Sequence, residues 1–263
     1  MNLGLAAKTA IVGGASRGLG YACAEALALE GADLAICSRN EEAIEAAAEC
    51  LRQSTGADVE PIVCNQRSAN DIEQLVSRAI ERFGGVDILV CNTGGPPAGT
   101  FSDHDDEAWR NAFEGLLLSG VRLCRSVLPV MQKNGWGRIV VNTSFTVKEP
   151  AERLILSNSL RAAVVGFSKT LSREVAKDGI TVNCVCPGAF DTERLRSIHE
   201  SEAASSGRTA EQVRAAWKSR IPIGRVSRPE EFGALVAFLC SERAGSITGT
   251  SLPVDGGMLR GLI

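Results

Sequence analysis

The sequence is poor in the side chains that most often move protons at neutral pH. Its 263 residues contain one tyrosine, Tyr21, and two histidines. Its nine cysteines include no Cys-x-x-Cys pair, so the sequence predicts neither a metal site nor a disulfide framework. We expect the thiols to be buried and reduced, because cysteine fits a protein core as a small apolar residue.

The chain also lacks the segments that mark nucleic-acid binding, secretion or membrane insertion. Its net charge is −3 and no cluster of basic residues occurs, which argues against a nucleic-acid partner. No apolar run is long enough to span a bilayer. Met1–Lys8 has neither the basic start nor the apolar core of a signal peptide. We therefore expect a cytoplasmic protein with no membrane partner.

What the chain does contain is a regular alternation of apolar strands and amphipathic helices. The expected strands are Ala10–Val12, Asp33–Cys37, Val59–Cys64, Val86–Cys91, Arg138–Asn142, Ile180–Val185 and Ser246–Val254. Strands that are apolar on both faces are typical of a parallel sheet covered by helices on each side. The sequence thus predicts one doubly wound α/β domain over residues 1–263, with a seven-stranded parallel sheet. One long helix is expected over Glu107–Lys133. The polar stretch at about 190–222 is expected to lie above the sheet as a substrate lid.

The first strand runs directly into a glycine-rich turn that is typical of phosphate binding. Gly14, Gly18 and Gly20 have the spacing G-x-x-x-G-x-G and stand between the first strand and the first helix. Without Cβ atoms the backbone can turn sharply there and approach a ligand closely. The free N–H groups of the helix N-terminus favour an anion, so the motif indicates a dinucleotide bound through its pyrophosphate. The predicted fold is therefore of the Rossmann type.

Five segments, spread in order over nearly the whole chain, resemble the short-chain dehydrogenase/reductase family, and within it the 3-oxoacyl-acyl-carrier-protein reductases. They are Gly14–Gly20, Asn92-Thr93-Gly94, Asn142-Thr143-Ser144, Pro187-Gly188 with Thr192, and Val254-Asp255-Gly256-Gly257. The resemblance implies an oxidoreductase that moves a hydride between a nicotinamide cofactor and a carbonyl compound or an alcohol. It also implies a homotetramer and a small-molecule or carrier-bound substrate.

The residues expected beside the adenosine ribose favour NADP(H), although NAD(H) is not excluded. The second strand leads into Ser38 and Arg39, where NAD-dependent members of the family usually have an acidic residue. Arg17 is expected close to the same site, and two guanidinium groups suit a 2′-phosphate. The resemblance assigns cofactor contacts to Gly14, Ser16, Arg17, Gly18, Leu19, Gly20, Ser38, Arg39, Asn65, Gln66, Asn92, Gly94, Arg161, Pro187, Gly188 and Thr192.

The catalytic segment departs from the family pattern. The family's Tyr-x-x-x-Lys pair aligns with Ser157 and Arg161, and its water-holding asparagine aligns with Leu116. Of the catalytic residues only Ser144, which polarises the substrate carbonyl, is kept. A serine hydroxyl is a far weaker acid than a phenol, whose pKa is about 10, and a guanidinium stays charged. Tyr21, in the first helix, is expected not to replace the missing tyrosine.

The remaining polar residues leave the source of the proton open. Ser144, Ser157 and Arg161 are expected to converge on one pocket as an oxyanion site. The candidate donors are water and Lys148, which follows Ser144 closely, although an exposed ion pair with Glu149 also accounts for Lys148. We expect both histidines, His104 and His199, to be surface residues near the site.

Three functions fit these observations. The favoured one is an NADP(H)-dependent oxidoreductase with a rebuilt proton supply, because hydride transfer is the chemistry of the cofactor itself. The others are a non-redox enzyme on the same fold and a catalytically inactive dinucleotide sensor. Arg153, Arg161 and Arg194 are expected near the pocket mouth, where they would suit an acidic or carrier-bound substrate.

Overall fold

The computed structural model describes residues 2–262, which are built around a seven-stranded sheet. The strand order is β3-β2-β1-β4-β5-β6-β7 and every neighbouring pair is parallel. The strands are β1 (Thr9–Gly13), β2 (Asp33–Ser38), β3 (Val59–Val63), β4 (Ile88–Cys91), β5 (Gly137–Asn142), β6 (Ile180–Pro187) and β7 (Ser251–Val254). This arrangement confirms the predicted Rossmann-type α/β domain.

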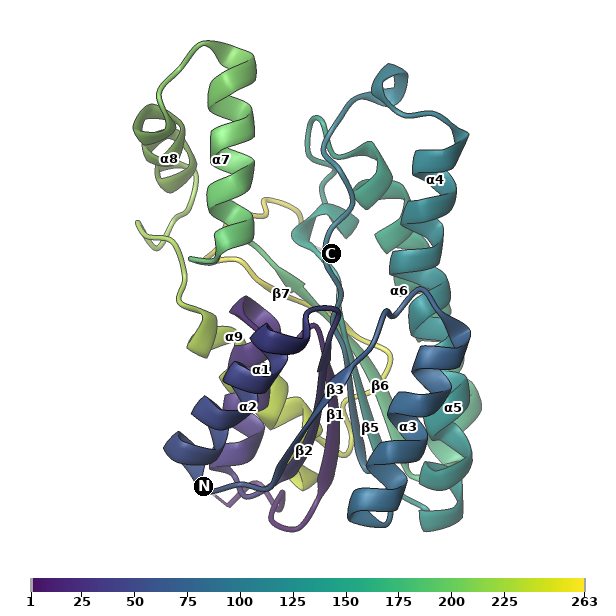
Figure 1. Cartoon of the computed structure of the whole chain (residues 1–263). Coiled ribbons are helices and arrows are strands. Elements are labelled where there is room, and N and C mark those ends of the chain that lie inside the picture. Colours follow the sequence, from purple (N-terminus) through teal and green to yellow (C-terminus); the bar gives the residue numbers. More distant parts are fainter. Residues whose placement is uncertain (1, 263) are drawn as a thin grey trace.

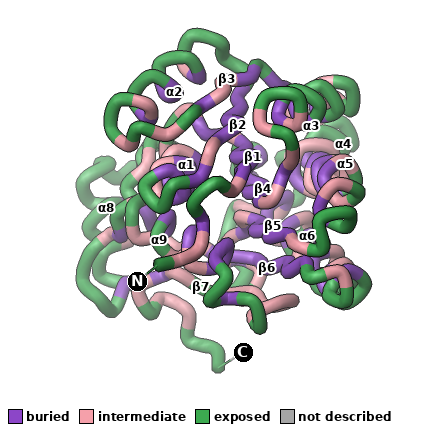
Figure 2. The backbone as a smooth tube through the Cα atoms, turned by 90° about the horizontal axis from the view of Figure 1, so that it is seen from below, coloured by how far each residue is buried: buried purple, intermediate pink, exposed green. Residues whose placement is uncertain are grey.

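Helices cover both faces of the sheet (Figure 1). One face carries α1 (Gly18–Leu29), α2 (Glu41–Thr55) and α9 (Pro229–Cys240), and the other carries α3 (Ala69–Phe83), α4 (Asp106–Phe113), α5 (Ser119–Asn134) and α6 (Ile155–Val175). Figure 2 shows the buried sheet between helices whose outer faces are exposed. Neighbouring residues of β1 alternate between the two cores, since Ala10 and Val12 pack on one side and Ile11 on the other. The apolar strands therefore fix both layers of helices.

The chain reverses its direction of winding at β1. It passes from β1 to β2 on one side of the sheet, and later returns to place β4 on the other side of β1. In an open parallel sheet such a switch point leaves a crevice outside the carboxyl ends of the strands. The glycine turn after β1 and Asn92 after β4 border this crevice.

The helix predicted over Glu107–Lys133 is interrupted by one π-helical turn, Glu114–Leu118. Gly115 lies in this turn, and the Ser119 hydroxyl donates to the Gly115 carbonyl at 2.8 Å. Glycine lowers the stability of a helix, and a serine side chain that bonds to the carbonyl of the preceding turn distorts the helix. Together these two residues account for the π-helical turn. Leu116, which the resemblance aligns with the family's asparagine, is buried in this turn.

The polar stretch after β6 forms α7 (Glu193–Ser206) and α8 (Ala210–Ser219), which stand beyond the carboxyl ends of the strands (Figure 1). His199 of α7 was expected at the surface, and this expectation was wrong. Its ring is buried edge-to-face against Trp217 of α8, with ring centroids 5.4 Å apart. The two helices therefore share a small core of their own.

The thiols are buried as expected, with one exception. All nine cysteines are free, and Cys50 alone among them is exposed. Within residues 2–262, no helix has the length and apolar character needed to cross a bilayer. In the same range, no three His, Cys, Asp or Glu side chains are grouped as metal ligands.

The contact between α1 and α9 gives a test of the fold. A Cβ atom at Gly233 of α9 would lie 2.3 Å from the Ala22 carbonyl oxygen of α1. Because a packed backbone yields little, Gly233→Ala is expected to lower the free energy of unfolding by about 1–3 kcal/mol in urea titrations. Gly166→Ala on α6, where an added Cβ meets nothing within 4 Å, is the control and is expected to raise it by up to about 1 kcal/mol. Equal stability of the two variants would contradict this close packing.

Candidate active site

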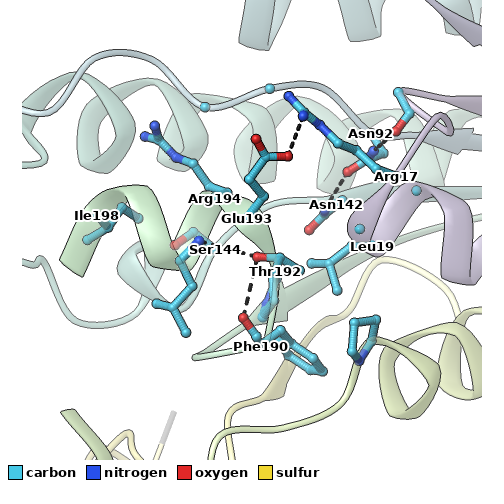
Figure 3. Close-up of a pocket in the computed structure, with 18 of the residues that line it drawn as sticks. Arg17, Leu19, Asn92, Asn142, Ser144, Phe190, Thr192, Glu193, Arg194 and Ile198 are labelled. Carbon is cyan, nitrogen blue, oxygen red and sulfur yellow. Dashed lines mark hydrogen bonds and ion pairs between the residues drawn. The ribbon is translucent and has the colours of Figure 1, made fainter. Parts of the chain in front are cut away.

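A cavity of about 860 Å³ lies at the carboxyl ends of the strands, between the sheet and α7 (Figure 3). It extends from the glycine turn to the loops that follow β4, β5 and β6. The predicted residues that line it are Gly14, Arg17, Gly18, Leu19, Gly20, Asn92, Gly94, Ser144, Ser157, Arg161, Pro187, Gly188 and Thr192. The other predicted residues lie outside it: Ser16, Ser38, Arg39, Asn65, Gln66 and Lys148.

The glycine turn has the geometry that a pyrophosphate requires. Gly14 and Gly18 have φ angles of 56° and 61°, a conformation that favours glycine. A Cβ atom at Gly20 would lie 2.2 Å from the Gly14 carbonyl oxygen. Arg17, the residue before α1, makes no side-chain cap, so the first N–H groups of α1 stay open to the cavity. These features fit a dinucleotide, whose pyrophosphate the N-terminus of α1 would hold.

The residues expected near the adenosine lie at the carboxyl ends of β2 and β3. The Ser38 hydroxyl donates to the Asn40 carbonyl at 3.0 Å. Arg39 is exposed, and within residues 2–262 it forms no ion pair. Gln66 donates from Nε2 to the Asn92 carbonyl at 3.2 Å, while its Oε1 is buried without a partner in the described chain. Asn65 is exposed and accepts a hydrogen bond from the Arg67 backbone N–H.

Arg17 is held by a partner that the sequence did not indicate. Its guanidinium forms an ion pair with Glu193, the first residue of α7 (Figure 3). The side chains of Arg17 and Glu193 are 73% and 63% exposed. An ion pair this exposed contributes little to stability, so Arg17 remains available to a more strongly charged partner.

Two asparagines join the ends of β1, β4 and β5 (Figure 3). Asn92 donates from Nδ2 to the carbonyls of Gly13 and Gly14 at 3.0 and 3.2 Å, and its Oδ1 accepts from Asn142 Nδ2 at 2.7 Å. Asn142 Oδ1 is buried and has no partner among the described residues. Since buried polar atoms are nearly always paired, this oxygen indicates a place for a ligand donor. The signal for this role of Asn142 in the sequence was a polar residue at the end of an apolar strand.

The structure brings Ser144, Ser157 and Arg161 to one part of the cavity. Ser144 follows β5, and its Oγ accepts from the Thr146 N–H at 3.2 Å. Ser157 and Arg161 lie one turn apart in α6 and are both buried. Arg161 donates from Nη1 to the carbonyls of Asn142 and Thr143, each at 2.9 Å. These bonds fix the guanidinium at the carboxyl end of β5.

Arg161 is a cation with little solvation. Burial, together with the nearby Arg194 guanidinium, lowers the pKa of Arg161 to about 10. The side chain therefore stays charged at neutral pH. No carboxylate in the described part of the chain forms an ion pair with it. A buried guanidinium without a counter-charge is suited to stabilise an oxyanion.

The candidate proton donors lie away from this group. Lys148 is exposed and borders a separate hollow with Glu149, Asp255 and the C-terminal segment. Tyr21 borders the main cavity from α1, where burial, with Glu25 adding to it, raises the pKa of its phenol. His199 faces α8, and burial lowers its pKa. No described histidine or lysine lines the main cavity.

Apolar residues of α7 and α8 also line the cavity. They are Leu195 and Ile198 of α7 and Trp217 of α8. Leu195 and Ile198 are one helical turn apart in an otherwise polar segment, which was the available signal in the sequence. These side chains give part of the cavity an apolar surface.

The glycine turn, the doubly wound sheet and the cavity at the switch point together define a dinucleotide-binding protein of the α/β class. Residues 14–259 match the family described as "Enoyl-(Acyl carrier protein) reductase". The 3-oxoacyl-[acyl-carrier-protein] reductase of Escherichia coli is 35% identical over 251 residues, which are 95% of this chain and 97% of the relative. The chain belongs to the short-chain dehydrogenase/reductase family.

Solved structures of reductases share the whole fold. L-sorbose reductase of Gluconobacter frateurii, complexed with NADPH and L-sorbose, superimposes with a TM-score of 0.94 at 34% identity, covering 100% of both chains. A variant of actinorhodin polyketide ketoreductase with NADPH gives a TM-score of 0.92 at 35% identity, covering 95% of this chain and 97% of its own.

The asparagine network gives a prediction for the site. Asn92→Ala removes the donor to two carbonyls and the acceptor for Asn142, so it is expected to lower the free energy of unfolding by about 1–3 kcal/mol. The measurement is chemical denaturation followed by circular dichroism. Asn70→Ala, at an exposed position in the first turn of α3, is the control and is expected to change it by less than about 0.5 kcal/mol. A loss at Asn92 no larger than the loss at Asn70 would show that the network is dispensable.

Proposed function

We propose that the protein is an NADP(H)-dependent oxidoreductase that reduces a carbonyl group, or oxidises the corresponding alcohol, beside Ser144, Ser157 and Arg161. The observation that carries this proposal is the continuity of one cavity from the glycine turn to these three side chains. Two similar reductases, of L-sorbose and of a polyketide, were solved with NADPH. The substrate is a small or carrier-bound carbonyl compound or alcohol, and α7 and α8 form its lid.

Arg17 and Arg39 support the choice of NADP(H). Arg39 is exposed and has no counter-charge in the described chain, and Arg17 can exchange its exposed pair with Glu193 for a 2′-phosphate. Charge-assisted hydrogen bonds to a phosphate are stronger than such a surface pair. The bound cofactor supplies the hydride. The cavity residues orient the substrate, which by itself provides a large part of the rate.

In this proposal the chain stabilises the substrate oxygen electrostatically. The hydroxyls of Ser144 and Ser157 donate hydrogen bonds to that oxygen, and the charge of Arg161 opposes the negative charge that develops on it. None of the three gives up a proton at neutral pH, and Lys148 lies outside the cavity, so the proton comes from water. Lack of a general acid typically costs 10²–10⁴-fold in rate, and we expect a slow enzyme. The homotetramer and the cytoplasmic location stay predictions.

Titration of NADPH and NADH, followed by nicotinamide fluorescence, tests the cofactor. NADPH is expected to bind with a Kd at least about tenfold below that of NADH. Arg39→Ala is expected to raise the Kd for NADPH by about tenfold and to leave the Kd for NADH unchanged. Arg110→Ala, at an exposed position on α4, is the matched control and is expected to change neither. Equal affinity of the wild type for both nucleotides would overturn the roles of Arg17 and Arg39.

Assays of NADPH oxidation with ketones and 3-oxoacyl thioesters test the reaction. Ser144→Ala and Ser157→Ala are each expected to lower kcat/KM by about 10²–10³-fold, because each removes a donor to the oxyanion, and to leave the Kd for NADPH unchanged. Ser159→Ala, exposed on α6, is the control. NADPH binding without turnover of any carbonyl would favour a dinucleotide sensor, an alternative that the absence of histidine and lysine from the described lining of the cavity supports. Failure to bind either nucleotide would refute both functions.

A further inference from the structure

Two arginines reach the cavity from opposite sides. Arg161 comes from α6 below, and Arg194 comes from the first turn of α7 above (Figure 3 labels Arg194 beside Glu193). Arg194 donates from Nη2 to the Pro96 carbonyl at 2.9 Å, so its side chain crosses from α7 to the loop after β4. Nη1 of Arg161 is occupied by two carbonyls, but its Nε and Nη2 donate to no residue of the described chain. These two nitrogens are therefore free to bind a ligand, and Arg161 lines the cavity.

The protein supplies no counter-charge for this pair within residues 2–262. Four carboxylates line the cavity, those of Glu25, Asp191, Glu193 and Glu230. Asp191 pairs with Arg196, and Glu193 pairs with Arg17. Glu25 and Glu230 belong to α1 and α9 and form no ion pair with either arginine of the pair.

The surroundings of both cations are unfavourable for charge. Burial lowers the pKa of each of them, and the pKa of Arg161 is lowered further by the charge of Arg194. Arg161 is buried and Arg194 is exposed at the cavity, so an anion that bonds to both offsets the unpaired charge of the buried guanidinium. The pyrophosphate of a dinucleotide does not fill this role, because the glycine turn and the N-terminus of α1 provide its place at the other end of the cavity.

We propose that Arg161 and Arg194 bind a carboxylate of the substrate, so that the carbonyl compound is an oxo acid. The parallel N–H groups at Nε and Nη2 of Arg161 match the two oxygens of a carboxylate. Ser144 and Ser157 also line the cavity, and Arg161 bonds to the carbonyl of Thr143, the residue before Ser144, so a carboxylate held by Arg161 brings a neighbouring carbonyl carbon toward the two hydroxyls. The reaction rests on the proposed function, but the binding step needs no turnover.

The test uses pairs of ligands that differ only in charge. A panel of 2-oxo and 3-oxo carboxylates, and the methyl ester of each, is titrated into the NADP⁺-saturated protein by isothermal titration calorimetry. At least one acid is expected to bind with a Kd about tenfold or more below that of its ester. Arg161→Gln and Arg194→Gln are each expected to remove about tenfold of that affinity. Arg153→Gln is the control, since Arg153 pairs with Asp103 at 4.0 Å and does not line the cavity.

The outcomes separate this inference from the proposed function. Arginine-dependent binding of an acid without NADPH oxidation would leave the carboxylate site in place and refute the reductase. Turnover of esters as efficient as that of acids would keep the reductase and refute the carboxylate site. Absence of binding by every acid would also refute it, as would an Arg194→Gln variant that weakens NADP⁺ binding instead of acid binding. Arg161→Gln removes a buried side chain and can prevent folding. In that case the result for Arg194→Gln decides between the outcomes.

Discussion

The hydrogen bonds of Asn92 hold the ends of three neighbouring strands together, and the cavity lies at these strand ends. Asn92 follows β4, yet its amide donates to two carbonyls at the end of β1 and accepts from Asn142 at the end of β5. Three neighbouring strands thus end at one fixed edge, although different loops continue from each. The glycine turn then folds back so tightly that Gly20 has no room for a Cβ atom. The N-terminus of α1 is consequently aimed at the same edge as Ser144 and Arg161.

In the proposed site at that edge, fixed charge and hydrogen bonds act on the substrate in place of a proton donor. A phenol beside a lysine can deliver a proton, whereas a serine beside a guanidinium can only donate hydrogen bonds and oppose negative charge. The carbonyls of Asn142 and Thr143 hold Arg161 in place, and burial lowers its pKa without removing its charge at neutral pH. Ser144 follows β5 at the same edge. In the proposed function Ser144, Ser157 and Arg161 therefore act together on the electrostatics of the site.

The sequence predicted the fold better than it predicted the contacts of the site. Apolar strands, glycine spacing and helical periodicity are local patterns, and they were sufficient to predict the sheet and the glycine turn. The π-helical turn at Glu114–Leu118 and the burial of His199 against Trp217 arise from packing between elements, which local patterns do not contain. The ion pair between Arg17 and Glu193 joins residues that are distant in the chain, so spacing could not reveal it. Lys148 is close to Ser144 in sequence, but the turn at Phe145–Val147 separates their side chains into two hollows.

The first turn of α7 links the two halves of the cavity. Thr192 caps this helix, Glu193 reaches the glycine turn through Arg17, and Arg194 reaches the loop after β4 at Pro96. Because Glu193 and Arg194 are consecutive residues, both contacts hold the same helical turn. Both contacts use exposed or half-exposed side chains, which makes each of them weak and reversible. The body of α7 packs against α8 through His199 and Trp217, so the two contacts at its first turn connect this pair of helices to the glycine turn and to the loop after β4.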